Sequence, residues 1–312
     1  MTTGVPYGLI AKRLRDGLVV PFLGAAASSA GVTEDGGGIL PTGCQLAEQL
    51  ITEWEGYPGR IGDPLTRVAQ YYAESAAGRY TVFTRFRQLF FEEQLVHGPA
   101  PTASLLARIE PPENSPFLII TTNYDCQVEK ALEQNGRDYV VVIQDSSPDT
   151  ANELQVWESG GASFKGIERG DLRLSAYKGK TLVYKLHGGF ATRLAEDLDT
   201  LVVTEADYIR FLASVSSETV PPNSITRHLL EHRQILFLGY SMEDWNLRVI
   251  LYKLQQLQPT GMEKSWGVRR GVGPLEKDFW SKRDVELYDM DLAEFVEKLS
   301  KRLQEEVAGG SA

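Results

Sequence analysis

The sequence contains few cysteines and histidines and has no excess of positive charge. Its 312 residues include two cysteines, Cys44 and Cys126, which form no CxxC pair. A disulfide framework is therefore not expected, and a zinc site made of four cysteines is excluded. Acidic side chains number 42 and basic ones 32, for a formal net charge of −10. Because such an acidic surface repels phosphate backbones, we expect no direct binding of nucleic acid.

Long hydrophobic runs are missing as well. The longest stretch of small and apolar residues, Leu18 to Val32, is interrupted by proline and serine. It is shorter than the ~20 apolar residues that a membrane-spanning helix needs. The N-terminal residues contain no apolar core of the signal-peptide type. With 42% hydrophobic and 24% charged residues, the sequence predicts a globular cytoplasmic protein without membrane contact.

Strand and helix patterns alternate along most of the chain, which is typical of a parallel sheet covered by helices. Strands are predicted at residues 18–23, 117–121, 139–142, 181–186, 201–203, 234–238, 266–268 and 285–288. Three successive helical patterns without an intervening strand lead us to interpret residues 43–110 as an inserted helical subdomain. The polar residues 144–180 are predicted to form a loop or small lid. We therefore predict one α/β domain over residues 1–312, with a Rossmann-like parallel sheet and helices on both faces.

Four of the predicted strands end in clusters of small or polar residues. In open parallel sheets, ligands bind outside the carboxyl ends of the strands. Four clusters at four strand ends therefore predict one shared crevice. In chain order the clusters are Gly24-Ala25-Ala26-Ala27-Ser28, Thr121-Thr122-Asn123-Tyr124-Asp125, His187-Gly188-Gly189 and Gly239-Tyr240-Ser241.

Each cluster also has a purely structural interpretation. The small residues after Gly24 allow a pyrophosphate to approach the backbone, but they also suit close packing of strand and helix. Asn123 and Asp125 can form an ordinary turn into a helix. A histidine at a strand end is usually structural, although the glycines after His187 permit close approach of a ligand. Ser241 can cap a helix without excluding contact with a nucleotide.

Taken together and in this order, the clusters resemble the motifs of the sirtuin family. They are most similar to its bacterial branch, the sirtuin-like domains of antiphage defence systems. GAAAS stands where the family has Gly-Ala-Gly-x-Ser, and TTNYD matches Thr-x-Asn-x-Asp. The residues KLHG at 185–188 match Lys-Leu-His-Gly, and GYSMEDWNLR contains the Gly-x-Ser motif. TEADY at 204–208 also resembles the bacterial branch, and the resemblance spans about Val20 to Leu251.

The resemblance implies that NAD is the substrate. Asn123 would hold the nicotinamide ribose and the attacking water, and His187 would act as the base. Asp125 would support the nicotinamide pocket, the first cluster would line the pyrophosphate, and the fourth would contact the adenosine half. The implied NAD-binding residues are Gly24, Ala25, Ala26, Ser28, Thr122, Asp125, Gly239 and Ser241.

Two departures from the family pattern bear on the reaction. Ala26 replaces the second loop glycine, and its methyl group narrows the approach of NAD to the backbone. The zinc-binding cysteines of deacylating sirtuins are absent, so residues 144–180 must take the place of their small domain and no metal is expected. We therefore predict hydrolysis of the nicotinamide–ribose bond to give nicotinamide and ADP-ribose, which depletes NAD in antiviral defence.

Two other functions are compatible with the same residues. One is an NAD-dependent protein deacylase, and the other is a non-catalytic nucleotide-sensing module. The resemblance also implies a homo-oligomer and a partner such as a HerA-type ATPase or an Argonaute-like protein. The sequence itself contains no recognisable P-loop and no nucleic-acid-binding tract.

Overall fold

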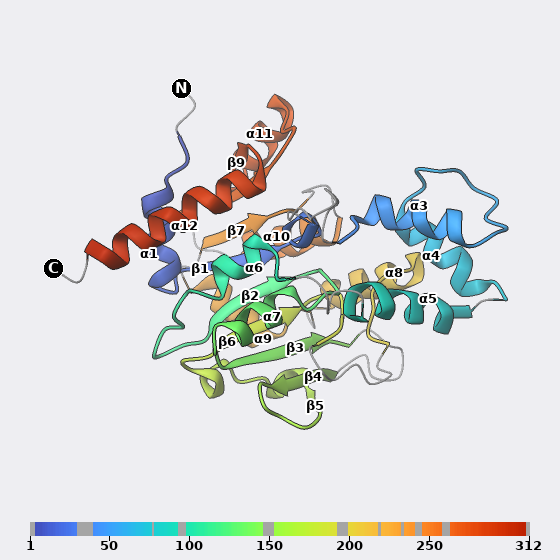
Figure 1. The fold of residues 1–312 in the computed structure, drawn as a ribbon, viewed down its shortest axis with the longest axis horizontal. Helices are drawn as coiled ribbons and strands as arrows, with labels where there is room; N and C mark the ends of the chain where they lie inside the picture. The colour runs from blue at the N-terminus through green and yellow to red at the C-terminus, as the bar shows by residue number, and fades with distance from the viewer. Residues whose placement is uncertain are drawn as a thin grey trace.

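The computed structural model describes residues 4–29, 40–76, 78–92, 98–145, 153–191, 199–217, 220–231, 234–240, 245–257 and 263–309. Within these residues, nine strands form one sheet in the order β5-β4-β3-β6-β2-β1-β7-β8-β9 (Figure 1). From β3 to β9 in this order, all neighbours are parallel, whereas β4 runs antiparallel to both β3 and β5. The strands are β1 (Val19–Leu23), β2 (Phe117–Thr121), β3 (Tyr139–Gln144), β4 (Glu153–Glu158), β5 (Lys165–Glu168), β6 (Thr181–Lys185), β7 (Gln234–Leu238), β8 (Ser265–Arg269) and β9 (Val285–Asp289).

The central strands are apolar along their length because both of their faces are covered. Every residue is buried in β1 (VVPFL), β2 (FLIIT) and β7 (QILFL). Alternate side chains enter opposite layers: Val19 and Leu23 belong to one apolar cluster, and Val20 and Phe22 belong to the other. A parallel strand buried on both faces requires this continuous apolar pattern. The prediction of a Rossmann-like sheet with helices on both faces is confirmed.

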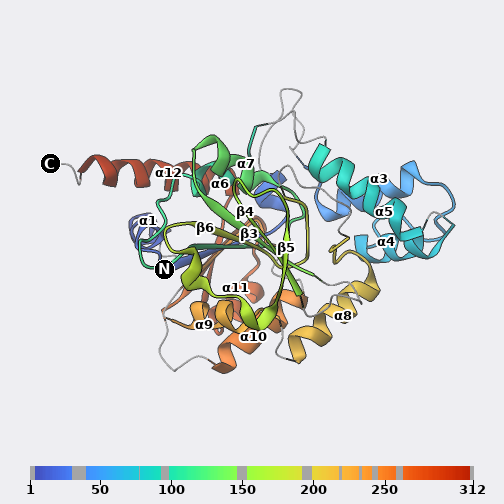
Figure 2. The ribbon, with the colours of Figure 1, turned by 90° about the horizontal axis from the view of Figure 1, so that it is seen from below.

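Two layers of helices cover the sheet (Figure 2). The first layer packs on the face of Val19 and Leu23, and the second packs on the face of Val20 and Phe22. The first layer contains α1 (Tyr7–Arg15), α6 (Pro101–Leu106), α7 (Gln127–Gln134) and α12 (Leu292–Gly309). The second layer contains α8 (Glu205–Ser216), α9 (Asn223–Leu230), α10 (Trp245–Leu257) and α11 (Pro274–Ser281). None of the helices in the described residues is both long and apolar enough to cross a membrane.

A third group of helices lies beyond the carboxyl ends of the strands (Figure 1). What we call the helical insertion consists of α3 (Gly43–Glu53), α4 (Leu65–Glu74), α5 (Gly78–Arg87) and the π-helical turn η1 (Gln88–Glu92). Thr42 and Gln45 form a capping box at the start of α3. The insertion has its own apolar cluster, which also includes Phe190, Leu201 and Val203.

The predicted subdomain boundaries at 43 and 110 are not tested by this arrangement and stay a prediction. The range also contains α6, which packs in the first helical layer and not with the insertion. The three predicted helices at its start are present as α3, α4 and α5.

The prediction of a loop over residues 144–180 is wrong for part of that range. β4 pairs antiparallel with β3 through residues such as Val156 and Leu154, which are buried, and β5 continues the sheet edge. The alternation in Glu153–Glu158 was obscured by the polar residues on either side. The short helices η3 (Arg169–Asp171) and η4 (Leu174–Tyr177) follow.

The predicted strand at residues 201–203 is also absent. These residues are buried and apolar, but they form no ladder with the sheet. In place of a ladder contact, the N–H of Val202 donates to the carbonyl of His187 at 2.9 Å. The segment therefore packs on a turn beyond the end of β6, where no strand edge is presented to it.

Candidate active site

All four sequence clusters meet at one cavity of about 650 Å³ beyond the carboxyl ends of β1, β2, β6 and β7. Ser241 lies outside the described residues. Every other predicted site residue lines the cavity, namely Gly24, Ala25, Ala26, Ser28, Thr122, Asn123, Asp125, His187 and Gly239. The shared crevice predicted from the strand ends is therefore present.

The turn after β1 packs directly against the turn after β7. The N–H of Gly24 donates to the carbonyl of Leu238 at 3.0 Å, and the N–H of Ala26 donates to the carbonyl of Gly239 at 3.1 Å. A Cβ atom on Gly24 would lie 2.7 Å from the Gly239 oxygen. Two small-residue turns are thus needed to bring these backbones together at the floor of the cavity.

Within this contact, Gly239 is the position where a side chain would be tolerated least. Its φ is +67°, and a Cβ atom would lie 2.2 Å from the amide nitrogen of Ala27. We expect Gly239→Ala to lower the free energy of unfolding by about 1–3 kcal/mol, because it adds both backbone strain and a clash. Urea denaturation measures this loss, and Gly136→Ala is the control. Gly136 also has positive φ (+62°), but no atom lies within 4 Å of its Cβ position. If both variants lose the same free energy of unfolding, the close approach of Gly239 to Ala27 does not contribute to stability.

Asn123 is oriented by two hydrogen bonds to the first cluster. Its side-chain Nδ2 donates to the carbonyl of Gly24 at 3.0 Å and to Oγ of Ser28 at 2.8 Å. Its backbone N–H donates to Oγ1 of Thr121 at 3.0 Å. A carboxamide held at both N–H groups has a fixed plane, so its oxygen has one direction in which to accept a hydrogen bond.

Asp125 lies next to a buried ion pair. Its Oδ1 accepts the N–H of Gln127 at 2.9 Å at the start of α7. Its carbonyl accepts from Nζ of Lys185, which also pairs with Oε1 of Glu129 at 2.8 Å. Lys185 and Glu129 are almost completely buried. Burial alone would lower the pKa of Lys185, but the Glu129 carboxylate outweighs it and raises the pKa, so the lysine stays charged.

His187 enters the same cavity from the end of β6. It is 2% exposed, and its ring meets those of Phe211 and Tyr208 edge-on, with centroids 4.8 and 5.5 Å apart. The chain turns away from the sheet at Gly188, where φ is +73° and a Cβ atom would lie 2.0 Å from the carbonyl oxygen of Thr200. The structure therefore brings the predicted imidazole and carboxamide to one cavity.

Several cavity residues were not identified from the sequence. Thr42, Gly43 and Cys44 at the start of α3 form part of the wall, as does Leu65 of α4. No local pattern marks these residues, because their role follows only from where the insertion docks. Beyond β8, the wall is completed by Arg269, Arg270, Asp291 and Leu292.

Among the residues that the structure describes, metal-binding side chains do not gather at this cavity. Within the described residues, no three or more His, Cys, Asp or Glu side chains lie together as a metal site would require. Cys44 is exposed and Cys126 is buried, and both are free. Burial raises the pKa of the Cys126 thiol well above its ordinary value, so it is a poor nucleophile.

Comparison with known proteins gives a family for this arrangement. The family model of the SIR2-like domain matches residues 118–288, which is more than half of the chain. A curated protein from Bacillus subtilis named Defense-associated sirtuin 2 is 23% identical over 165 residues. That alignment covers 53% of this chain but only 13% of the relative, so the chain spans a small part of the relative's length.

Among solved structures, one described as "Structural Basis for the Mechanism and Regulation of Sir2 Enzymes" is 13% identical, with a TM-score of 0.43. The alignment covers 98% of this chain and all of that one. The family assignment itself depends on the domain match, whose range contains the second, third and fourth clusters. With these clusters at the ends of β2, β6 and β7, the chain belongs to the SIR2-like family.

Proposed function

We propose that this chain is an NAD⁺ glycohydrolase, which cleaves the nicotinamide–ribose bond to give nicotinamide and ADP-ribose. The observation that carries the proposal is that Asn123 and His187 line the same cavity as the small-residue turn Gly24 to Ser28. Those groups come from three strand ends. Together they provide an amide that can position the substrate, a base, and a stretch of backbone that a ligand can approach closely. This combination suits a reaction at the sugar of a dinucleotide.

The shape of the cavity supports an extended ligand. It runs from His187 after β6, across the turn after β1, to Arg269 and Asp291 beside β8. Its volume of about 650 Å³ falls within the range of ~300–1,000 Å³ that is usual for ligand pockets. In the proposed complex, the nicotinamide half lies at the β2–β6 side and the adenosine half at the β7–β8 side.

The proposed reaction needs little acid catalysis. Nicotinamide in NAD⁺ is already a cationic leaving group, and the ribose carbon passes through an oxocarbenium-like state. Water attacks this carbon as the carbon–nitrogen bond breaks, and the electron pair of that bond leaves with neutral nicotinamide. Asn123 positions the ribose and the water, while His187 takes the proton that the water loses.

The test is to incubate the purified chain with NAD⁺ and to follow nicotinamide by chromatography. We expect release by the wild type and a rate about 100-fold lower for Asn123→Ala, because positioning of the reacting groups is lost. Asn135→Ala is the matched control: its Nδ2 donates to the carbonyl of Ala131 at the end of α7, outside the cavity lining. Absence of release by the wild type, or full release by Asn123→Ala, would overturn the proposal.

Two further assays, compared with nicotinamide release, separate the alternative functions. A labelled acyl-lysine peptide that is deacylated faster than NAD⁺ is hydrolysed would make the chain a deacylase. ADP-ribose binding by calorimetry without any turnover would make it a nucleotide-sensing module. We give hydrolysis priority because the sequence has only two cysteines, too few for the four-cysteine zinc site in the small domain of deacylating sirtuins.

We also propose that the reaction depletes NAD in the cytoplasm during antiviral defence. The name of the Bacillus subtilis relative connects that protein with defence. The proposed setting includes a homo-oligomer and a HerA-type ATPase or Argonaute-like partner. The test is to measure the NAD level after phage challenge in cells that express the chain. A fall that is absent with Asn123→Ala supports the proposal, and an unchanged NAD level contradicts it.

A further inference from the structure

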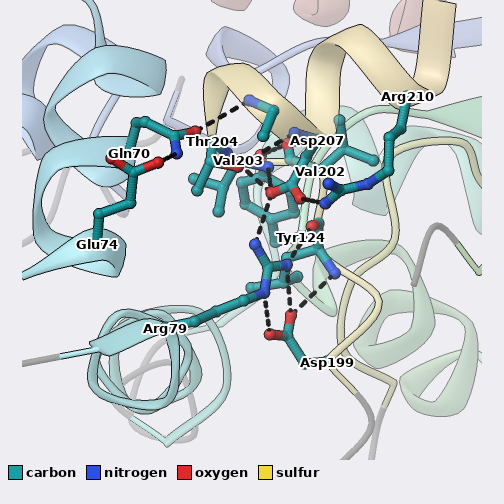
Figure 3. Close-up of polar contacts among 12 residues, drawn as sticks. Gln70, Glu74, Arg79, Tyr124, Asp199, Val202, Val203, Thr204, Asp207 and Arg210 are labelled. Atoms are coloured by element: carbon teal, nitrogen blue, oxygen red, sulfur yellow. Dashed lines mark hydrogen bonds and ion pairs between the residues drawn. The ribbon is translucent and has the colours of Figure 1, made fainter. Parts of the chain in front are cut away.

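Arg79 of α5 extends out of the helical insertion to the segment 199–203 (Figure 3). Its guanidinium binds the Asp199 carboxylate through two hydrogen bonds, Nε to Oδ2 at 2.6 Å and Nη2 to Oδ1 at 3.0 Å. Nη2 also donates to the carbonyl of Leu201 at 2.9 Å. A bidentate guanidinium–carboxylate pair fixes orientation as well as distance. One side chain of the insertion therefore fixes the position of this segment.

The segment 199–203 in turn contacts the turn that carries His187. The N–H of Val202 donates to the carbonyl of His187 at 2.9 Å, and the N–H of Gly189 donates to Oγ1 of Thr200 at 3.2 Å. At Gly188 the two backbones are so close that a Cβ atom would lie 2.0 Å from the carbonyl oxygen of Thr200. We therefore expect displacement of the segment to shift His187.

The same segment also holds the turn that carries Asn123. The hydroxyl of Tyr124 donates to the carbonyl of Val202 at 2.6 Å (Figure 3). The Tyr124 ring lies edge-on to Phe86 and Phe90 of the insertion, with centroids 5.6 Å apart in both pairs. Val202 thus bonds to both turns that present the proposed catalytic groups.

Arg79 has a second carboxylate partner at the start of α8. Nη1 lies 2.8 Å from Oδ2 of Asp207, which also accepts the N–H groups of Val203 and Thr204 at 3.1 and 2.9 Å. Burial would raise the pKa of Asp207, but the hydrogen bonds from Arg79 and these N–H groups outweigh it and lower the pKa. The carboxylate stays ionised at neutral pH. Directly after Asp207, and one turn further along, α8 provides Tyr208 and Phe211, whose rings contact His187.

We propose that Arg79 is a positioning residue for His187, acting through the segment 199–203 and the start of α8. The helical insertion is then part of what aligns the base, in addition to forming a wall of the cavity. The inference rests on the proposed NAD hydrolysis for its kinetic readout. Arg79 is not among the residues that line the cavity, so we expect it to make no direct contact with the ligand.

The test compares Arg79→Gln with Arg85→Gln. Arg85 is on the same helix and also binds a carboxylate through two hydrogen bonds, but its partner is Glu53 within the insertion. We expect Arg79→Gln to lower kcat about 10- to 100-fold with KM for NAD⁺ nearly unchanged, because the base is misplaced. Arg79→Lys keeps the charge without the two-pronged geometry and should recover part of the rate. Arg85→Gln should keep the wild-type kcat.

A readout that does not depend on turnover is the imidazole signal of His187 in the NMR spectrum of histidine-labelled protein, assigned with His187→Gln. We expect the signal to shift or broaden in Arg79→Gln and to stay unchanged in Arg85→Gln. If the wild type releases no nicotinamide, the proposed function fails, while the NMR comparison still decides the role of Arg79.

Asp199→Asn provides a second variant in case Arg79→Gln does not fold, and it should reproduce both effects from the other side of the contact. The inference is overturned if folded Arg79→Gln or Asp199→Asn keeps the wild-type kcat and His187 signal. It is equally overturned if Arg85→Gln loses as much kcat as Arg79→Gln, since that result indicates general loosening of the insertion.

Discussion

Replacement of His187 by glutamine is expected to lower the rate of nicotinamide release about 10²- to 10⁴-fold, because general acid–base catalysis contributes that much. Glutamine is preferred to alanine because the His187 ring packs edge-on against Phe211 and Tyr208, and alanine would leave a void there. Glutamine retains polar atoms and much of the volume but is not a base. The measurement is kcat, with ADP-ribose binding by calorimetry as the check that the cavity is intact.

The matched control for this prediction is His228→Gln. His228 is also buried, at 7% exposed, but it lies on α9 outside the cavity lining. It should keep the wild-type rate. If His187→Gln hydrolyses NAD⁺ within threefold of the wild type while binding ADP-ribose normally, His187 is not the base, and the imidazole serves only the packing of the β6 turn.

The variant Lys185→Met should lower the free energy of unfolding by about 3–5 kcal/mol, because it leaves Glu129 as an uncompensated buried charge. Lys185 is 0% exposed and Glu129 is 1% exposed, so water cannot take over the missing interaction. The carbonyl of Asp125 loses its donor in the same variant. Denaturant unfolding at pH 7 measures the loss.

The double variant Lys185→Met/Glu129→Met tests the cause of this loss. It removes both charges and should recover most of the stability, since apolar residues of similar volume can replace a buried pair. Lys180→Met is the control, because Lys180 pairs with Glu158 at 2.7 Å on the surface and should cost about 0–1 kcal/mol. The cause is refuted if the double variant is as unstable as Lys185→Met alone.

Local sequence patterns suffice to predict an element whose conformation depends mainly on its own residues. The fully buried strands were visible as unbroken apolar runs, such as FLIIT for β2. The capping box of Thr204 and Asp207 at the start of α8 likewise depends only on residues that are close in sequence. Because alternating strands and helices predict parallel strands, the sequence also predicts that the four clusters lie at one edge of the sheet.

Contacts between distant segments could not be read in this way. Arg79 finds its carboxylates 120 and 128 positions along the chain, and nothing in the sequence around α5 marks it. The apolar residues 201–203 favour a strand locally, but tertiary packing against the His187 turn determines their conformation. The strand β4 was missed for the opposite reason, since its buried side chains lie between polar neighbours that resemble a loop.

The apolar cluster of the helical insertion includes residues from both sides of its junction with the sheet. Phe83 of α5 meets Phe190, with ring centroids 5.7 Å apart, and Leu201 and Val203 complete the same cluster. Because the insertion and the sheet domain share this apolar cluster, separating them would expose apolar surface to water, and we expect them to unfold together. We therefore expect that the insertion cannot be moved to another protein as an independent unit. Its aromatic residues can change in evolution only together with their partners, such as Phe190, in the turn that follows β6.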